Sequence, residues 1–576
     1  MTRHASCAAY PSHVSSRLMR PLALASLSVL LLTGCRSARD TLGEASELFA
    51  EGGSRVLREP MRPVRGTTRV LILAFDGVGD PVLRRALADG SLPALSALLG
   101  ERQGENVWAH GYAAPGVTSV YPAETAAGWA AVYTGRPPAE TGIAGNEWFS
   151  RDSLVVYAPV PLSVGTVEQT LRIYTDDLLG SLIRTPTLFE RADVRSHVSL
   201  GFVSHGADLL TLPDLNDVGD LLEGAVGALV SGRDEIYEEL DDDSWEGVER
   251  GAEQYGVPDL QVAYFPGIDL VAHDGGSDAQ QRYLREETAD DVARVLDVYR
   301  QRGLLDSTYV VVVADHGHTE SLADDRHSLG GDPDGDEPAA LLDSLGLRVR
   351  DFTIAADSSD FNVAMTYNEA TAMIYLADGA RCPERGVVCD WSRPPRFEED
   401  VLRTARAFRD ASDSGDSTAF GLGDALDLVL VRTSDPTGRT NPPFRVLDGD
   451  RVVSVPDYLA AHPRPDLVDF DRRLHWLTNG PYGHHAGDVI LLAKSGDGRP
   501  LAERFYFGTP RSSGHGGAGV SDSTIPLLVA RQNRTGAALQ RTVTAAVGPA
   551  PTQLDVTALV LSLLDEGRRG GAPSRR

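Results

Sequence analysis

Short runs of apolar residues alternate with helix-like segments over much of this chain. Six runs are rich in Val, Ile and Leu, as expected for strands that are buried on both faces of a sheet. They are 69–75, 199–204, 260–265, 308–314, 488–493 and 524–530. Segments such as 80–99 and 279–303 are predicted helices. Strands that alternate with helices favour a mainly parallel central sheet with helices on both faces, so the pattern predicts an α/β fold.

Residues 320–480 break this alternation, because they are rich in Asp, Gly and Pro and contain few strong strand patterns. We interpret this part of the chain as an inserted cap region, with strands near 372–376 and 427–432. The C-terminal residues have the composition of a disordered tail. The predicted organisation is a core in two parts (67–325 and 481–565), an insertion or cap between them (326–480) and a tail (566–576).

The N-terminal residues have the features of an export signal. An apolar run over 22–34 follows two arginines and ends at Cys35, and its length suits a signal peptide better than a membrane-spanning helix. The sequence LTGC at its end resembles a bacterial lipobox. That resemblance implies a lipoprotein signal peptide over 1–34, a lipidated Cys35 thiol, and a tether over 35–66. We therefore expect export and anchoring to the bacterial cell envelope, at the outer membrane; secretion without a lipid is the alternative.

Two cysteines remain after such processing, Cys382 and Cys389. In an oxidising compartment a pair this close in sequence predicts a local disulfide that closes a small loop. A metal site is the weaker interpretation, because two cysteines alone do not complete a tetrahedral ligand set.

Three of the apolar runs are followed by an acid: Asp76, Asp269 and Asp315. Ligands bind at the carboxyl ends of the strands in open α/β sheets, so we expect these acids to converge. Each one alone would also suit a helix N-cap. Together they repel one another, and a bound cation removes that conflict. His273 follows Asp269 by four residues and His316 follows Asp315 directly. Aspartate with histidine, without cysteine, suits zinc or manganese.

At these motifs the sequence resembles the alkaline phosphatase superfamily, and within it the type I phosphodiesterase/nucleotide pyrophosphatase family, over about 69–325 and 484–532. LILAFDGVG resembles the family's first metal-binding strand, YPAETAAGW begins its nucleophile segment, and VADHG and SGHGG resemble its later metal-binding motifs. The resemblance implies an alkaline-phosphatase-like sandwich with two divalent metal ions, expected to be Zn²⁺. It assigns one ion to Asp269, His273 and His515, and the other to Asp76, Asp315, His316 and the hydroxyl of the nucleophile Thr125.

The chemistry that this resemblance implies is hydrolysis of a small-molecule phosphate ester. Two metals about 4 Å apart bind the attacking and leaving oxygens of an in-line displacement, and a metal favours the ionised hydroxyl of Thr125. Thr125 also precedes a helix-like segment, whose N-terminal N–H groups suit phosphate oxygens. The expected intermediate is a phosphothreonine that water then hydrolyses.

Two departures from the family's pattern bear on the substrate. Gly128 lies three residues after the nucleophile, where many phosphodiesterase members have an asparagine, and Asn146 is a candidate substrate-binding residue nearby. The Lys-x-Arg pair of threonine-type phosphomonoesterases is missing from 201–210, where His205 is a second candidate, with a plain structural role as its alternative. Because a dianionic monoester then has no dedicated cation, we expect a diester to be preferred. A phosphomonoesterase and a phosphoryl transferase remain alternatives on the same scaffold.

Composition limits the partners. With 54 Lys and Arg against 82 Asp and Glu the formal net charge is −28, which disfavours nucleic acids and anionic lipids as general partners. The expected partners are a small phosphate ester and, through the lipid, a membrane; oligomeric state stays open. We place the second organic group of a diester on an apolar wall near Trp129 or Trp148. A non-catalytic binding module is disfavoured, because every expected ligand position is filled.

Overall fold

The structure is a computed structural model, and its described part excludes the N-terminus, the C-terminus and several internal segments. The predicted signal peptide, Cys35 and most of the predicted tether therefore lie outside the described residues. Within the described part, no helix combines the length and the hydrophobicity needed to cross a membrane. The described residues are 53–66, 68–160, 177–213, 233–330, 338–350, 360–382, 386–416, 420–435 and 441–570.

A nine-stranded sheet forms the larger half of the described fold. Its five central strands are parallel to one another, and the strands added at both edges are antiparallel. The predicted α/β class with a mainly parallel centre is confirmed. The order is β1 (Ser54–Val56), β9 (Leu209–Thr211), β8 (Ser196–Ser199), β10 (Leu260–Phe265), β2 (Arg69–Phe75), β11 (Thr308–Ala314), β24 (Leu527–Ala530), β4 (Gly111–Ala113) and β3 (Val107–Trp108).

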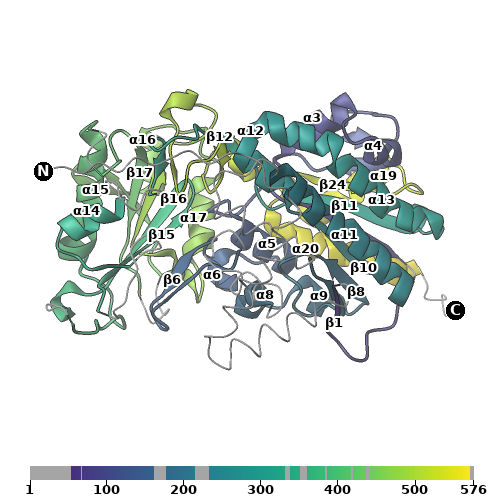
Figure 1. Ribbon diagram of the computed structural model, residues 1–576, viewed down its shortest axis with the longest axis horizontal. Coiled ribbons are helices and arrows are strands. Elements are labelled where there is room, and N and C mark those ends of the chain that lie inside the picture. Colours follow the sequence, from purple (N-terminus) through teal and green to yellow (C-terminus); the bar gives the residue numbers. More distant parts are fainter. Residues whose placement is uncertain are drawn as a thin grey trace, which may run out of the picture. The chain divides into compact units, whose positions relative to one another are not determined.

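Strands β2, β10 and β11 lie side by side and are buried almost throughout. Their side chains are covered on both faces, which is why each strand is a continuous apolar run rather than an alternating one. The helices that flank this sheet fall into two groups whose members pack against one another (Figure 1). One group is α3 (Asp80–Asp89), α4 (Pro93–Leu99), α11 (Arg233–Tyr255), α12 (Gly267–Glu286) and α13 (Thr288–Gln301); the other is α5 (Thr125–Thr134), α9 (Leu188–Ala192), α19 (Gly536–Val547) and α20 (Val556–Gly570).

A second sheet of seven strands is built largely from the predicted insertion and is drawn in green in Figure 1. Its described strand pairs are antiparallel except for the first. Four helices accompany this part of the chain: α14 (Pro338–Ser344), α15 (Arg403–Asp413), α16 (Val455–Ala461) and α17 (Phe470–Thr478). The strand order is β14 (Val349–Arg350), β15 (Val363–Asn368), β16 (Thr371–Leu376), β20 (Val489–Ala493), β17 (Leu426–Val431), β18 (Arg445–Asp448) and β19 (Arg451–Ser454).

Several short strand pairs and helices complete the described elements. The pairs are β5 (Val117–Thr118) with β23 (Thr524–Ile525), β6 (Trp148–Ser150) with β7 (Val155–Tyr157), β12 (Thr319–Glu320) with β22 (Ser513–Gly514), and β13 (Ser328–Leu329) with β21 (Tyr506–Phe507). The short helices are α6 (Pro138–Thr141), α8 (Leu178–Leu182) and α18 (Val520–Ser523).

The run 488–493 was assigned to the core, and the structure places it elsewhere. It forms β20, which pairs with β16 and β17 in the middle of the second sheet. An apolar run predicts a buried strand but does not say which sheet buries it. The insertion also contains more strands than its Asp, Gly and Pro content indicated, although the two predicted strands near 372–376 and 427–432 are present as β16 and β17.

Other predicted elements differ at their ends. The strand predicted over 199–204 is β8, which stops at Ser199 because Leu200 adopts a positive φ of 63° that ends the extended backbone. The helix predicted over 80–99 is two helices, separated at Gly90 and Pro93. The helix predicted over 279–303 is likewise divided between α12 and α13.

The predicted terminal segments also contribute regular structure. Residues 54–56, from the predicted tether, form β1 and pair with β9 at the edge of the first sheet. Helix α20 continues to Gly570, so residues 566–570 of the predicted tail are helical.

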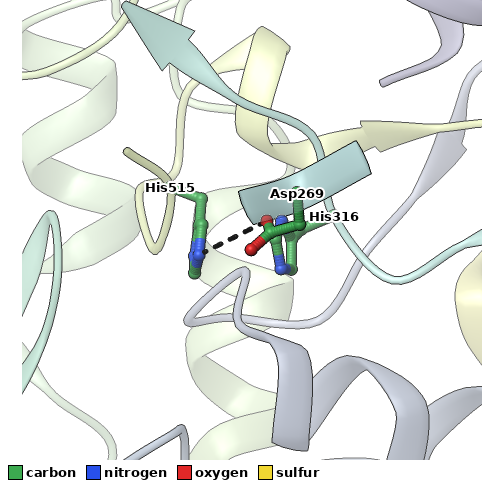
Figure 2. Close-up of side chains that lie close together, drawn as sticks. All are labelled: Asp269, His316 and His515. Carbon is green, nitrogen blue, oxygen red and sulfur yellow. Dashed lines mark ion pairs between the residues drawn. The ribbon is translucent and has the colours of Figure 1, made fainter. Parts of the chain in front are cut away.

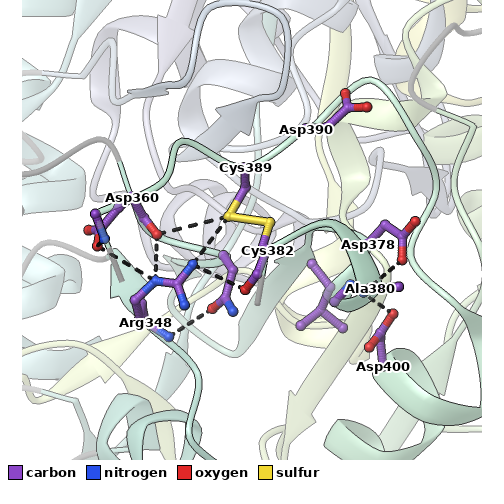
Figure 3. Close-up of a disulfide and its surroundings, with 12 residues drawn as sticks. Arg348, Asp360, Asp378, Ala380, Cys382, Cys389, Asp390 and Asp400 are labelled. Atoms are coloured by element: carbon purple, nitrogen blue, oxygen red, sulfur yellow. Dashed lines mark hydrogen bonds and ion pairs between the residues drawn. A yellow bond between two sulfur atoms is a disulfide. The ribbon is translucent and has the colours of Figure 1, made fainter. Parts of the chain in front are cut away.

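Cys382 and Cys389 form a disulfide in the second part of the fold, as the local pairing predicted (Figure 3). Arg348 lies against it: its Nη2 is 3.4 Å from the Cys382 carbonyl oxygen and 3.4 Å from Cys389 Sγ. Arg348, the residue before β14, therefore links the disulfide loop to the start of the second sheet.

Candidate metal centre and active site

The carboxyl ends of three adjacent parallel strands place the predicted acids at one edge of the first sheet. Phe75, at the end of β2, is in register with Phe265 of β10 and with Ala314 of β11. Asp76 and Asp315 are the next residues after β2 and β11. Strand β10 leads instead into α12, which carries the remaining acid, Asp269, in its first turn.

The first donor cluster consists of Asp76, Asp315, His316 and Thr125. His316 Nε2 lies 3.5 Å from Asp76 Oδ1, 3.2 Å from Asp315 Oδ2 and 3.2 Å from Thr125 Oγ1. All four side chains are buried, with Thr125 the most exposed at 8%. The two acids and the imidazole present ligand atoms within 4.8 Å of one another, which is the spacing of a metal site.

Each acid of the first cluster has one oxygen held by the protein and one oxygen without a partner. Asp76 Oδ2 accepts hydrogen bonds from Trp129 Nε1 (3.2 Å) and from the Tyr264 hydroxyl. Asp315 Oδ1 accepts one from Gly77 N (3.2 Å). Asp76 Oδ1 and Asp315 Oδ2, which face His316, are buried without any hydrogen-bond partner. Buried carboxylate oxygens left unpaired are costly, and a cation between them removes that cost.

The second donor cluster consists of Asp269, His273, His515 and Glu369. Asp269 and His273 lie one turn apart on the same face of α12, with His273 Nε2 3.2 Å from Asp269 Oδ2. His515 follows β22, and its Nε2 is 4.0 Å from Asp269 Oδ1 and 3.7 Å from Glu369 Oε1. Glu369 Oε1 is also 3.6 Å from His273 Nε2. This cluster joins two residues of α12, the helix that follows β10 of the first sheet, to a residue in a hairpin turn of the second sheet.

The three predicted histidine ligands are oriented in the same way. Nδ1 of His273, His316 and His515 lies 2.9, 3.2 and 3.2 Å from the backbone carbonyl oxygens of Ser513, Gly317 and Ala123, respectively. A carbonyl only accepts, so Nδ1 carries a proton, and Nε2 is the nitrogen available to a metal ion. This is the arrangement that orients a metal-binding imidazole.

The two clusters adjoin. The rings of His316 and His515 stack with centroids 3.8 Å apart. Asp269, His316 and His515 present ligand atoms within 4.8 Å of one another, and Figure 2 shows their side chains converging. His318 supports the junction: its Nε2 is 2.6 Å from Asp269 Oδ1 and its Nδ1 is 3.0 Å from Ser513 Oγ.

The electrostatics of the two clusters differ. Burial, followed by the charge of Asp269, raises the pKa of Asp76 to about 7. Burial and the charges of Asp76 and Asp269 raise the pKa of Asp315 well above its usual value. Burial opposes ionisation of Asp269 too, but His273 and His318 outweigh it and hold its pKa well below its usual range. The acids of the first cluster therefore have the greater need of a bound cation.

Two glycines let the chain approach this centre closely. Gly77, directly after Asp76, has a φ of 67°, and a Cβ there would lie 2.6 Å from Asp269 Oδ1 and from His318 Nε2. A Cβ at Gly128, in α5, would lie 2.7 Å from Asp315 Cβ. A larger side chain at Gly128 would therefore clash with Asp315.

Of the two candidate substrate-binding residues, only one lies beside the clusters. Asn146 Oδ1 accepts a hydrogen bond from Ala126 N (2.8 Å), beside Thr125, and Asn146 lines a pocket next to the clusters. His205 is not part of the site: its half-exposed ring lies 3.5 Å from Asp177 and 3.8 Å from Glu190.

The predicted apolar wall was wrong. Trp129 and Trp148 are each only 1% exposed; Trp129 donates to Asp76, and Trp148 stacks on Tyr157. Neither indole lines the pocket beside the clusters. The aromatic residues that line the pocket are Tyr367, Tyr506 and Phe507.

Two carboxylates of the site were not predicted. Glu369 occupies the turn between β15 and β16, where nothing in the local sequence indicates a functional role. Glu124 immediately precedes the nucleophile; it is fully buried, neither of its carboxylate oxygens has a hydrogen-bond partner, and Oε2 lies 3.5 Å from His515 Nδ1. Its place beside Thr125 was the one signal that pointed to it.

Comparison with known proteins agrees with the motifs. Residues 70–330 match the family model described as type I phosphodiesterase / nucleotide pyrophosphatase. Among curated proteins, none matches this chain.

Similar solved structures include murine ectonucleotide pyrophosphatase / phosphodiesterase 5, in an inactive form in complex with AMP. The two sequences are 13% identical and the TM-score is 0.45; the alignment covers 86% of this chain and 95% of the murine chain. The human protein of the same name has 13% identity, a TM-score of 0.46 and the same coverage. Phosphonoacetate hydrolase from Sinorhizobium meliloti 1021, in complex with phosphonoformate, has 15% identity and a TM-score of 0.44, covering 88% of this chain and 99% of that one.

Proposed function

We propose that this chain, whose residues 70–330 match the type I phosphodiesterase / nucleotide pyrophosphatase family of phosphoester hydrolases, cleaves phosphodiester or nucleotide pyrophosphate bonds. The proposed reaction proceeds through a phosphothreonine on Thr125 at a two-zinc site. The observation that carries this proposal is the position of Thr125. Its hydroxyl lies 3.2 Å from His316 Nε2 in the first cluster and at the first residue of α5.

The donor set fits two divalent ions. The first cluster has two orphaned carboxylate oxygens and the Nε2 atom of His316, and the second has carboxylates and the Nε2 atoms of His273 and His515. Oxygen and nitrogen donors of this kind suit zinc. When bound, the ions would supply positive charge for the attacking and leaving oxygens of an in-line displacement.

Residues of this chain would then bind the phosphoryl group and carry out the two displacement steps. The start of α5 favours an anionic phosphoryl group at Thr125, and Asn146 lies beside that helix start. Thr125 Oγ forms a bond to phosphorus as the bond from phosphorus to the leaving oxygen breaks, and the leaving alcohol takes up the proton. Water then cleaves the phosphothreonine, which restores the Thr125 hydroxyl and releases the phosphate monoester.

The charge around the site favours a diester over a monoester. Glu124 and Glu369 add two carboxylates to the three aspartates, and the pocket's Arg511 lies 3.6 Å from Glu369. A dianionic monoester gains less from such surroundings than a monoanionic diester. The diester's second organic group would lie against Tyr367, Tyr506 or Phe507.

A matched panel of an aryl monoester, an aryl diester and a nucleotide, measured with the zinc-loaded protein, tests this proposal. We expect kcat/KM for the diester or nucleotide to exceed that for the monoester by at least about tenfold, equivalent to about 1.4 kcal/mol in the barrier. The Thr125→Ala protein, prepared identically, measures contaminating activity. A monoester preferred by the same margin would make this a phosphomonoesterase, with Arg511 as the cation; a new ester formed with an added alcohol would indicate a transferase.

The proposal includes export and a lipid anchor at Cys35, supported by the LTGC motif after the apolar run. A lipid contributes about 0.8 kcal/mol per buried CH₂, so several acyl chains hold a protein firmly at a membrane. Cell fractionation tests this: Cys35→Ser should leave the membrane fraction or remain unprocessed. A wild-type protein that is wholly soluble, with Cys35 unmodified, would contradict it.

A further inference from the structure

The turn between β15 and β16 brings a carboxylate of the second sheet into the metal centre. Asn368 pairs with Thr371, so Glu369 and Ala370 form the two-residue turn of this hairpin. Glu369 has a φ of 48°, a backbone conformation that non-glycine residues rarely adopt. Such residues cluster at functional sites, where the surrounding structure holds them.

The surrounding structure holds this turn against the segment that carries His515. His515 N donates a hydrogen bond to Glu369 Oε2 (2.7 Å), and Ala370 N donates one to the His515 carbonyl oxygen (3.0 Å). Phe507 N donates to the Glu369 carbonyl oxygen (2.6 Å). Three bonds therefore fix the turn, and they leave the other carboxylate oxygen, Oε1, directed at the second cluster.

Glu369 Oε1 has the spacing of a metal ligand. It lies 3.6 Å from His273 Nε2 and 3.7 Å from His515 Nε2, while Asp269 Oδ2 is 3.2 Å from His273 Nε2. Donors about 2.0–2.1 Å from one tetrahedral zinc ion are separated by about 3.3–3.4 Å. In both imidazoles Nδ1 faces a backbone carbonyl oxygen, so Nε2 is the nitrogen directed towards Glu369 Oε1.

We propose that Glu369 is a fourth protein ligand, through Oε1, of the metal ion held by Asp269, His273 and His515. This inference rests on the metal site of the proposed function and adds to it a ligand from the second sheet. In three-ligand zinc sites the fourth position is left to water or substrate. Glu369 would take that position here, so a substrate oxygen would have to displace it or add to the ligand set.

Zinc binding to the metal-free protein, measured by competition with a chromophoric chelator, tests this inference. Wild type should bind two zinc ions per chain. Glu369→Gln keeps an oxygen that accepts from His515 N but loses the charge, so one of the two ions should bind at least about tenfold more weakly. The increase in Tm on adding zinc should shrink accordingly. Unchanged affinity for both ions would overturn the inference.

Two control variants separate ligation from other roles. Glu320→Gln removes an exposed carboxylate on β12, four residues after His316, and should leave both affinities unchanged. Arg511→Gln removes the cation that lies 3.6 Å from Glu369 Oε1 and should not weaken zinc binding. If either control weakened zinc as much as Glu369→Gln, the effect would be one of charge or of the ion pair, and ligation would be wrong.

The outcome also distinguishes this inference from the function on which it rests. A wild type that binds no zinc would overturn both. A wild type that binds two ions and hydrolyses diesters, with Glu369→Gln binding zinc normally, would overturn the inference alone. If Glu369→Gln does not fold, which the Tm of the metal-free protein would show, Glu369→Asp replaces it. Aspartate keeps the charge but is one CH₂ shorter, so its zinc affinity should fall between those of wild type and a variant without the ligand. Wild-type zinc affinity in Glu369→Asp would also count against ligation.

Discussion

The two donor clusters lie next to each other and are built in different ways. In the first cluster, Asp76 and Asp315 directly follow adjacent parallel strands, and Thr125 begins a helix that packs against them. In the second, Asp269 and His273 come from a helix, and Glu369 comes from a hairpin of the other sheet. The first cluster therefore forms at the edge of one sheet. The second forms only where the helix that follows β10 meets a hairpin of the second sheet.

The clusters also differ in how their charges are balanced within the protein. Asp269 has two histidines close to its oxygens, and its pKa is held low by His273 and His318 against the effect of burial. Asp76 and Asp315 each leave one oxygen unpaired, and their pKa values are raised. Protein groups therefore balance part of the charge of the second cluster, whereas the proposed metal ion would balance the charge of the first. Three predictions test this difference.

The largest expected effect belongs to Thr125, the proposed nucleophile in the first cluster. Thr125→Ala should lower kcat by at least about 10³-fold with both metals still bound, because binding and metal charge alone leave a residual rate. Thr125→Ser should keep a substantial part of the activity. Steady-state kinetics with metal analysis measures this, and Thr134→Ala, at the other end of α5, is the matched control. Near-normal activity in Thr125→Ala would make water the direct nucleophile.

Metal content should separate the clusters next. Asp76→Asn removes one of the two carboxylates of the first cluster, and His515→Ala removes a nitrogen donor of the second, so each variant should retain one zinc ion where wild type binds two. Elemental analysis of the purified proteins after dialysis measures this. Loss of both ions from either variant would mean that the clusters act as a single site, contrary to the separation described above.

The smallest expected effect is on the stability of the metal-free protein. The pKa of Asp76 is raised from 3.8 to about 7, so its folded form favours the proton. The corresponding stability is present below about pH 4 and is lost as pH rises towards about 7. Asp76→Asn, which does not ionise, should therefore melt closer to wild type at pH 5 than at pH 8, where it should be the more stable of the two. Parallel Tm values at both pH values would show that Asp76 does not titrate in this way.

Prediction from the sequence succeeded for the acidic residues that come shortly after a buried strand. The bounds of β2, β10 and β11 agree with the predicted runs, and the acids after them converge because parallel strands end at the same edge. The seven residues predicted to bind metal or to act as nucleophile lie in the two clusters; their roles remain predictions. His205 and the two tryptophans were misplaced, because local sequence does not show whether a ring lies in a cleft or in the core.

The sequence by itself determined the α/β class, the strand ends and the positions of the metal-binding motifs, because these depend on periodicity and on residues close together along the chain. Tertiary structure alone decided which sheet contains β20 and which residues surround His515. Glu369 lies 96 residues from His273 and 146 from His515 along the chain, and Glu124 is 391 residues from His515. No local preference specifies contacts at such separations; they arise from the tertiary packing that buries apolar surface and brings a hairpin turn of the second sheet to the proposed metal centre.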